Sequence, residues 1–405
     1  MSTGFRRSSA SPARTPSLIA LVGLSASLAA CATPGGVVGP SPTEPGSVVT
    51  REGVTPPFMA GRRIVRVGLL LPFSTRPADA SALYSAAELA LFDHGGPNML
   101  LIPRDSGGDE AAAAAAGQAL VRDGADIIVG PVLREGVEGV AGVARRERIP
   151  VIGFSSDRTV AGNGVYLLSF QLEDEVARLV SFAASRNIRT IALLAPENEY
   201  GRRVDQALRA EAQRRGVTVV SSVLYPRTDA EAMAAAGRIA QQLQVTPAQG
   251  IVIAETGTAL RVIGPSLVRA GVNPRQVQLL GTSAWASGDA QREPTYAGGW
   301  YVAPDPTVRT EFERRYRQAY NVEPTRLASL SYDAVSLAAL LSTDVGASGL
   351  SRTAIERSDG FLGSDGVFRF RGDGSIERGL AIMEVRQGQT VPIDPAPRRF
   401  TAPAS

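Results

Sequence analysis

The run Ile64-Val65-Arg66-Val67-Gly68-Leu69-Leu70-Leu71 is the first of eight short apolar segments that decide the fold class of this 405-residue chain. The other seven segments cover residues 99–104, 126–130, 150–155, 188–195, 217–225, 250–255 and 276–282. Strands that are apolar throughout need cover on both faces, and helical patterns separate these segments. The alternation therefore predicts an α/β fold in which helices wind around parallel sheets.

The helical patterns between the strands have clear apolar faces. Apolar residues between positions 176 and 184 recur at i, i+3, i+4, i+7 and i+8, and residues 204–212 repeat much of this spacing. Gly216 is predicted to end the second of these helices, and Asp109 is predicted to cap the start of an alanine-rich helix over residues 109–124.

The alternation of strands and helices ends toward the C-terminus. Two helices are predicted over residues 310–320 and 327–341, followed by the dipeptides Asp365-Gly366 and Asp373-Gly374, which are typical of tight hairpin turns. Arg371-Gly372-Asp373 falls in such a turn, and we interpret it as turn chemistry rather than as an adhesion motif.

Composition narrows the possible chemistry. Every basic residue is arginine, and removal of the three arginines among the first 30 residues from the 42 basic residues leaves 39 against 39 acidic ones. This balance gives no support for nucleic-acid binding. The single histidine, His94, precedes Gly95-Gly96 and is interpreted as a helix C-terminal residue, with a catalytic base as the alternative. With one cysteine and one histidine, and no phosphate-binding loop or catalytic triad motif, we expect no enzyme activity, metal or cofactor.

The N-terminal residues indicate export. Three arginines precede an apolar run over residues 18–28 that is too short to span a bilayer, so residues 1–30 are predicted to be a signal peptide. Leu28-Ala29-Ala30-Cys31 resembles the lipobox of bacterial lipoproteins, which implies that Cys31 is acylated and anchors the chain to a membrane by lipid alone. Ala32 favours the outer membrane, on its periplasmic side. Residues 31–63 are predicted to be a flexible linker, and residues 388–405 a disordered tail.

A set of landmarks in order along the chain resembles the type I periplasmic binding proteins of the leucine/isoleucine/valine receptor family. They are the first strand through Pro72, the segment 123–131 that ends in Gly130-Pro131, Ile149-Pro150-Val151-Ile152-Gly153, Tyr200-Gly201, and Ser331-Tyr332-Asp333-Ala334-Val335. The resemblance covers residues 64–387. It implies two doubly wound α/β lobes joined by crossovers with a cleft between them, lobe one holding residues 64–168 and 304–358 and lobe two residues 169–303 and 359–387.

Within that superfamily the chain resembles the penicillin-binding-protein activator lipoproteins. The likeness rests on the loop 130–138 and on residues 168–178, whereas the helical-repeat domain that such activators can carry has no counterpart before Ile64. The resemblance implies a partner that synthesises peptidoglycan.

Ligands of open α/β sheets bind beyond the carboxyl ends of the strands. The residues that we expect to line the cleft are Ser74, Ser155, Ser156, Tyr200, Glu255, Thr256, Ser283 and Trp285. Hydroxyl groups suit a carboxylate and an acid suits an ammonium group, as an amino-acid receptor requires. Each residue also has a structural alternative, because strand-end serines cap helices and tryptophans fill cores.

Two functions remain open at the level of sequence. In the first, the protein is a tethered activator of a penicillin-binding protein, with the exposed Arg134 as a partner-binding residue. In the second, it is the solute-binding receptor of an ABC importer for branched-chain or other amino acids and presents its loaded form to a permease.

Overall fold

The computed structural model describes residues 48–50, 53–55, 59, 61, 63–304 and 306–401. The predicted signal peptide and the predicted lipid anchor Cys31 lie outside these residues. Within the predicted linker, β1 (Val48–Thr50) and β2 (Gly53–Thr55) pair as a short antiparallel hairpin. No helix in the described ranges is long and apolar enough to cross a membrane.

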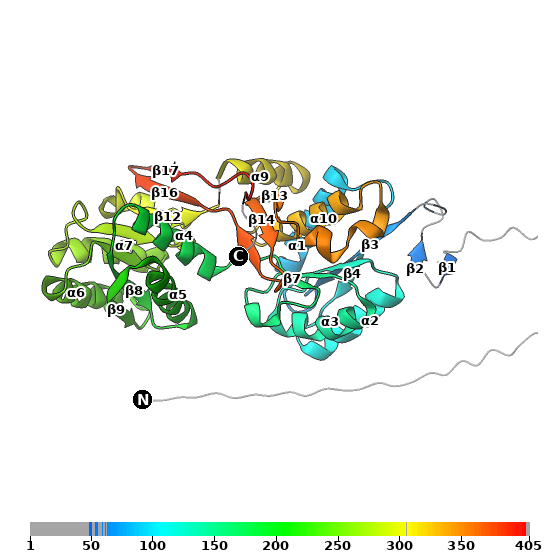
Figure 1. The fold of residues 1–405 in the computed structure, drawn as a ribbon, viewed down its shortest axis with the longest axis horizontal. Coiled ribbons are helices and arrows are strands. Elements are labelled where there is room, and N and C mark those ends of the chain that lie inside the picture. The colour runs from blue at the N-terminus through cyan, green and yellow to red at the C-terminus, as the bar shows by residue number, and fades with distance from the viewer. Residues whose placement is uncertain are drawn as a thin grey trace, which may run out of the picture. The chain divides into compact units, whose positions relative to one another are not determined.

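The first lobe is built on a five-stranded parallel sheet in the order β4-β3-β5-β6-β7 (Figure 1). Its strands are β3 (Val65–Leu71), β4 (Met99–Asp105), β5 (Ile127–Val129), β6 (Val151–Gly153) and β7 (Val165–Leu167). All seven residues of β3 are buried, as expected for an apolar central strand.

Helices cover both faces of this sheet (Figure 1). Leu69 of β3 shares one core cluster with α1 (Pro77–His94) and α10 (Ala328–Ser342), whereas its neighbour Leu70 shares another with α2 (Glu110–Arg122) and α3 (Arg134–Glu147). Successive strand residues point to opposite faces, so the two halves of the first lobe's core meet in one strand.

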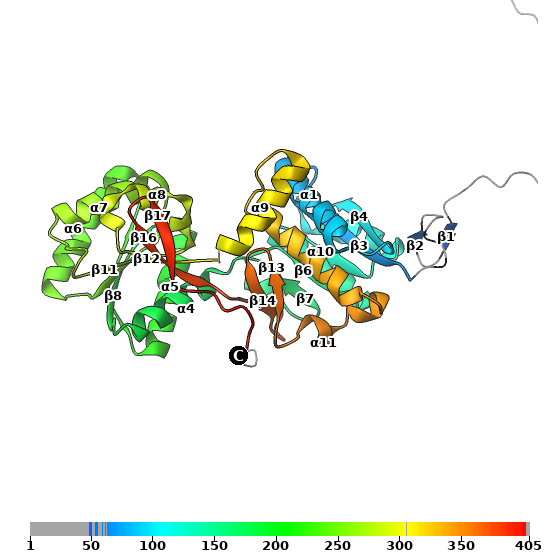
Figure 2. The ribbon, with the colours of Figure 1, turned by 90° about the horizontal axis from the view of Figure 1, so that it is seen from above.

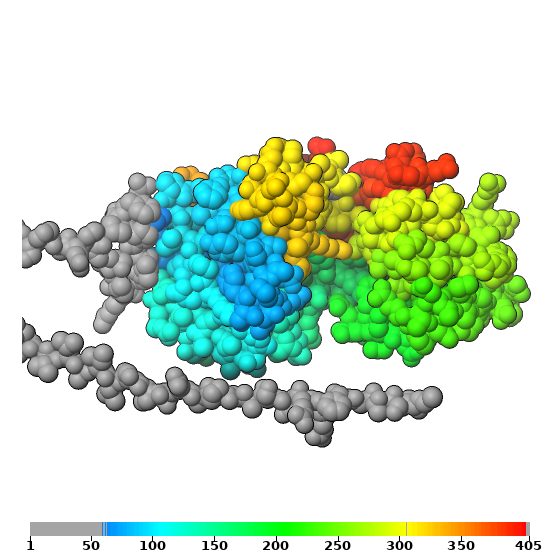
Figure 3. Space-filling model, turned by 180° about the vertical axis from the view of Figure 1, so that it is seen from behind, coloured from blue at the N-terminus to red at the C-terminus, as the bar shows by residue number. Residues whose placement is uncertain are grey.

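A further helix, α9 (Pro306–Tyr320), lies against α1. Phe312 and Tyr316 of α9 pack with Ala86 and Leu89 of α1, and Figure 3 shows α9 in yellow beside α1 in blue. The returning chain therefore completes the first lobe, as the resemblance implied.

The second lobe is built on a seven-stranded sheet in the order β17-β16-β12-β11-β10-β8-β9. Five strands are parallel, and β16 and β17 run antiparallel at one edge. The strands are β8 (Thr190–Pro196), β9 (Thr218–Tyr225), β10 (Gly250–Ile253), β11 (Gln278–Gly281), β12 (Trp300–Ala303), β16 (Ala381–Arg386) and β17 (Gln389–Asp394).

Two helices cover each face of the second sheet. The helices α4 (Leu172–Ser185) and α5 (Glu199–Arg215) pack on one face, and α6 (Asp229–Val245) and α7 (Gly257–Arg269) pack on the other. A short helix, α8 (Asp289–Arg292), follows β11. The predicted two-lobe α/β fold is therefore confirmed.

Several local predictions are also confirmed. The side chain of Asp109 accepts a hydrogen bond from the N–H of Ala112 at the start of α2, and Gly216 ends α5 with a φ of 64°. His94 is the last residue of α1. Residues 371–374 form the turn between β14 (Gly366–Phe370) and β15 (Ile376–Arg378).

The end of the chain differs from the prediction in two ways. Residues 361–378 were expected in lobe two, but β13 (Phe361–Gly363), β14 and β15 form a separate antiparallel sheet whose phenylalanines join the core of lobe one. Figure 2 shows β13 and β14 beside α10. The short helix α11 (Arg352–Ile355) precedes them.

Residues 389–394 were expected in a disordered tail, but they form the edge strand β17. Pro392 misled the prediction, because proline is tolerated on an edge strand. Further along the tail, Phe400 lies under the guanidinium of Arg369, with 4.3 Å between the guanidinium carbon and the ring centroid. The chain is thus folded well past residue 387.

Candidate ligand-binding cleft

Three of the residues predicted to bind ligand, Ser156, Tyr200 and Ser283, line one cavity of about 620 Å³ between loops of the two lobes. This cavity, which we call the cleft, lies within the size range of small-molecule sites. The other residues that line it are Phe170, Leu172, Glu175, Asn198, Glu199, Arg203, Ala284 and Arg326. Three of the eight predicted residues therefore line this cavity, and the rest of its wall was not predicted.

The first turn of α5 positions Tyr200. Asn198 accepts the N–H of Gly201 at 3.0 Å and so fixes the start of the helix. The Tyr200 hydroxyl lies 2.7 Å from Oγ1 of Thr282, and burial raises the pKa of Tyr200 to about 12. Tyr200 is therefore a neutral hydrogen-bonding group at physiological pH.

A buried acid, Glu175, forms the floor of the cleft. Its carboxylate accepts the Ser283 hydroxyl at 2.7 Å and the Ser283 N–H at 3.1 Å. Burial raises the pKa of Glu175, opposed by the guanidinium of Arg326 and by the Ser283 hydrogen bonds. Arg326 and Ser283 thus partly offset the cost of burying the Glu175 charge, without any ligand.

The principal cation of the cleft is Arg326, which lies between α9 and α10. Its Nη2 is 3.8 Å from Oε1 of Glu175 and donates to Oγ of Ser283 at 3.2 Å. The guanidinium carbon lies 4.4 Å from the ring centroid of Phe170, and the side chain is 50% exposed. Arg326 therefore links the lobes while remaining open to solvent.

A second ion pair lies at the rim. Arg203 of α5 contacts Glu173 of α4 through both Nε and Nη2, the shortest distance being 2.9 Å. Both side chains are about one-third exposed. The pair joins the N-terminal parts of α4 and α5.

Sequence reasoning missed Glu175 and Arg326 for different reasons. Glu175 lies four residues before Leu179, so an acid on the apolar face of α4 was a usable signal. The loop that carries Arg326 has no comparable pattern, and only the fold brings this residue to Ser283.

A second cavity of about 690 Å³, the second chamber, shares Ser283, Ala284 and Arg326 with the cleft. The predicted residue Thr256 lies there, with its hydroxyl 3.0 Å from that of Ser287. The remaining residues that line the second chamber are Ala286, Gln291, Tyr301, Ala303, Pro304, Pro306, Arg309, Met383 and Thr390. Ser283 and Arg326 form the wall between the two spaces.

Two of the residues predicted to bind ligand, Glu255 and Trp285, instead bond to other residues of the second lobe. Glu255 is 2% exposed, accepts the Tyr225 hydroxyl at 2.9 Å and pairs with Arg227 at 3.0 Å, and it lines neither cavity. Trp285 is fully buried and donates its indole N–H to the carbonyl of Ile253. Their structural partners, rather than a ligand, account for both side chains.

Two predicted serines lie in loops away from the cleft wall. Ser155 is buried, and its hydroxyl accepts the N–H of Asp157 at 3.2 Å. Ser74 is exposed, and its own N–H donates to Asp105. Both serines lie in turns that follow strands, and neither caps a helix as the structural alternative expected.

Arg134, the predicted partner-binding residue, begins α3. Its side chain is 50% exposed and pairs with Glu138 at 2.8 Å and with Asp157 at 3.1 Å. The guanidinium is accessible but held by two acids.

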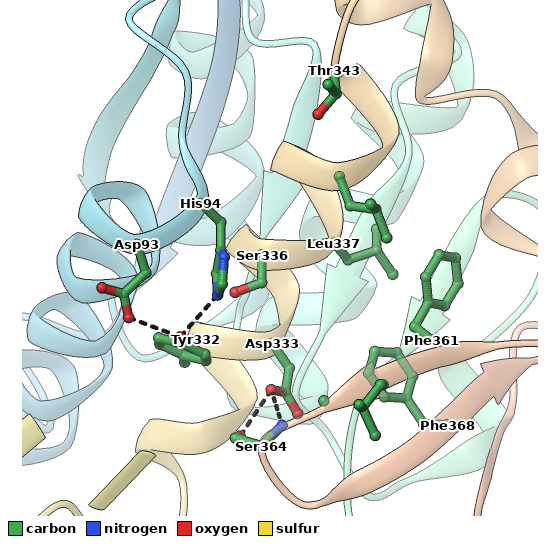
Figure 4. A pocket seen from close by; sticks show the side chains of 13 residues that line it. Asp93, His94, Tyr332, Asp333, Ser336, Leu337, Thr343, Phe361, Ser364 and Phe368 are labelled. Atoms are coloured by element: carbon green, nitrogen blue, oxygen red, sulfur yellow. Dashed lines mark hydrogen bonds between the residues drawn. The ribbon is translucent and has the colours of Figure 1, made fainter. Parts of the chain in front are cut away.

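A third cavity of about 500 Å³ lies in the first lobe beside α10 (Figure 4). Nε2 of His94 is 2.9 Å from the Tyr332 hydroxyl, which donates to Asp93 at 2.8 Å. On the other side of the cavity, Asp333 accepts the N–H and O–H of Ser364. Burial, followed by the charge of Asp365, raises the pKa of Asp333 to about 7. No group of three or more His, Cys, Asp or Glu residues suited to a metal ion occurs in the described part of the chain.

Comparison with known proteins places these observations in a family. The profile of the family described as "Periplasmic binding protein" matches residues 64–390. A comparison with curated proteins gave no match.

The solved structures that resemble this chain share its fold. A Rhodospirillum rubrum protein assigned to branched-chain amino acid ABC transport is 19% identical, with a TM-score of 0.71 over 82% of this chain and 100% of that one. An R. palustris solute binding protein in complex with benzoate is 17% identical, with a TM-score of 0.55 over 84% and 97%. A Streptococcus pneumoniae branched-chain amino acid transporter substrate binding protein in complex with isoleucine is 16% identical, with a TM-score of 0.55 over 82% and 100%.

Proposed function

This chain belongs to the family of periplasmic binding proteins, and we propose that it is a solute receptor that binds a small organic carboxylate, such as an amino acid, in its cleft. The observation that carries the proposal is Arg326. A guanidinium has five N–H donors, and among the described residues the Arg326 guanidinium donates to one acceptor, Ser283. The remaining donors are available to a carboxylate, which arginine binds in a bidentate manner.

The rest of the cleft suits the same class of ligand. The hydroxyls of Ser156 and Tyr200 lie in the same wall, and Phe170 and Leu172 supply apolar surface. For an amino acid, Glu175 and Glu199 are the acids that line the cleft and could face an ammonium group. The isoleucine and benzoate bound by two structural relatives both carry a carboxylate.

In this role the chain works outside the cytoplasmic membrane and passes its ligand to an ABC permease. Closure of the two lobes around the ligand would be the motion that the permease recognises. An acylated Cys31 would keep the receptor near the membrane surface.

A thermal-shift panel tests the proposal. Leucine, isoleucine, benzoate and the amide of each, which lacks the carboxylate charge, are added to the folded protein, which a bound ligand stabilises by about 2.7 kcal/mol at 100 times Kd. We expect a rise in Tm with at least one carboxylate and none with its amide. The rise should disappear in Arg326→Gln, with far-UV circular dichroism as the control for folding. A panel in which amides and acids act equally would contradict the role of Arg326.

A second candidate is the activator of a penicillin-binding protein. The observation that favours it is Glu255, because the acid expected to hold an ammonium group is already paired with Arg227 and bonded to Tyr225. Co-purification of a penicillin-binding protein with the tagged chain, in the absence of any carboxylate effect on Tm, would favour this function over the receptor.

A further inference from the structure

Three residues, Ser283, Ala284 and Arg326, line both the cleft and the second chamber and separate the two spaces. Of the three shared residues, Arg326 is long and half-exposed, and Ser283 and Ala284 are small. A ligand bound to the guanidinium of Arg326 would therefore be in reach of both spaces. The two cavities are neighbours on either side of one cation.

The second chamber differs from the cleft in its chemistry. Tyr301, Ala303 and Met383, from β12 and β16, are buried and give it an apolar wall, which prolines and alanines extend. The described residues that line it include two arginines and no carboxylate. The apolar wall suits the apolar body of a ligand, and the arginines suit its negative charge.

Only one of these arginines is free to bind a ligand. Arg309 donates to Glu313 at 2.6 Å and to Asp365 at 2.7 Å, so two carboxylates already hold its guanidinium. Arg326 is 3.8 Å from its nearest carboxylate oxygen, which is longer than a hydrogen bond. The negative end of a ligand therefore belongs at Arg326.

We propose that the cleft and the second chamber form one site for an elongated monocarboxylate, with the carboxylate at Arg326 and an alkyl chain or aryl ring in the second chamber. The proposal rests on the proposed receptor function and deepens it by naming the ligand class. It also explains why Glu255 need not face the site, since such a ligand has no ammonium group.

A length series of carboxylates measures the second chamber. Isothermal titration of the full chain with butanoate, hexanoate and octanoate, and with 4-phenylbutyrate beside benzoate, gives a Kd for each. We expect affinity to rise about fourfold with each methylene that becomes buried. Octanoate should then bind about 15-fold more tightly than hexanoate. The matching alkyl amines should not bind.

Two variants test whether the gain in affinity with chain length comes from the second chamber. Ala286 lines the second chamber and is exposed, so Ala286→Trp should fill that space without disturbing the core. It should weaken octanoate at least 10-fold and leave butanoate unchanged. Ala230→Trp, at an exposed alanine of α6 outside the cavities described above, is the matched control and should leave both affinities unchanged.

The outcomes separate this proposal from the receptor function. If short carboxylates or leucine bind and added length gives no gain, the second chamber is not part of the site and the receptor function stands. If Ala286→Trp and Ala230→Trp weaken octanoate equally, the chain does not enter the second chamber. If no carboxylate binds the wild-type chain, both proposals fail.

Discussion

Replacement of Asp333 by asparagine should stabilise the protein, and increasingly so as the pH rises from 4 to 7. Asp333 lies on α10 and is 2% exposed. Its Oδ1 accepts the N–H and O–H of Ser364 at 2.7 and 2.8 Å, whereas Oδ2 has no hydrogen-bond partner among the described residues. Asparagine keeps the accepting oxygen and the shape, and it removes the charge.

The magnitude follows from linkage between proton binding and folding. The pKa of Asp333 is raised from 3.8 to about 7, first by burial and then by Asp365, with the charge of Arg378 acting in the opposite direction. Below pH 3.8 the carboxyl is protonated in both folded and unfolded chains. As the pH rises, the unfolded chain loses this proton first, so wild-type stability falls by about 1.4 kcal/mol per pH unit until the folded carboxyl also ionises near pH 7. The full difference is about 4 kcal/mol.

Urea unfolding of both proteins at half-unit steps from pH 4 to 8 measures this difference. Far-UV circular dichroism is the suitable signal, because both tryptophans lie in the second lobe and Asp333 lies in the first. Other raised acids, such as Asp174, titrate equally in the two proteins and cancel. A constant stability difference across the pH range would refute the reasoning, and so would an asparagine variant that loses stability as the pH rises.

Three further predictions concern residues that the sequence singled out. Trp285→Ala should destabilise the second lobe by about 3–5 kcal/mol, because it empties a buried site beside Tyr296, and urea unfolding followed by the fluorescence of Trp300 measures the loss. Cys31→Ser should release the chain from the membrane fraction and abolish labelling by radioactive palmitate; labelling that persists would exclude this anchor. Arg134→Glu should reduce co-purification of a penicillin-binding protein if the activator function holds, while the carboxylate-dependent Tm shift stays unchanged.

The fold was predictable because its signals are local and repeated. The parallel strands are rich in apolar residues, and the helices that cover them repeat apolar residues every three or four positions. The strands β7 and β12 were not among the eight predicted segments. The lobe that receives residues 361–378 was missed because the phenylalanines of that sheet fit either core, and only the packed structure shows which one they join.

Part of the lining of the candidate site was predictable from the sequence. The rule that ligands bind beyond strand ends led to Ser156, Tyr200 and Ser283, which the fold does bring together. It also selected Trp285, whose indole the fold turns into the core. The rule identifies the loop and does not fix which way each side chain points.

Glu255 shows how neighbours decide the chemistry of a site. Its position after β10 suits an ammonium-binding acid, but Tyr225 at the end of β9 and the nearby Arg227 satisfy its carboxylate inside the second lobe. The sequence places these partners about 30 residues away, so the contact became visible only in the structure. Glu255 is therefore not available to a ligand, whereas Arg326 keeps spare donors, and an amino acid would have to rely on Glu175 or Glu199, the acids that line the cleft, for its ammonium group. A carboxylate without an ammonium group makes no such demand, and the comparison of leucine with 4-methylpentanoate, which lacks only that group, tests the point directly. Equal or tighter binding of 4-methylpentanoate is the expected result, and a clear preference for leucine would show that Glu175 or Glu199 completes an amino-acid site.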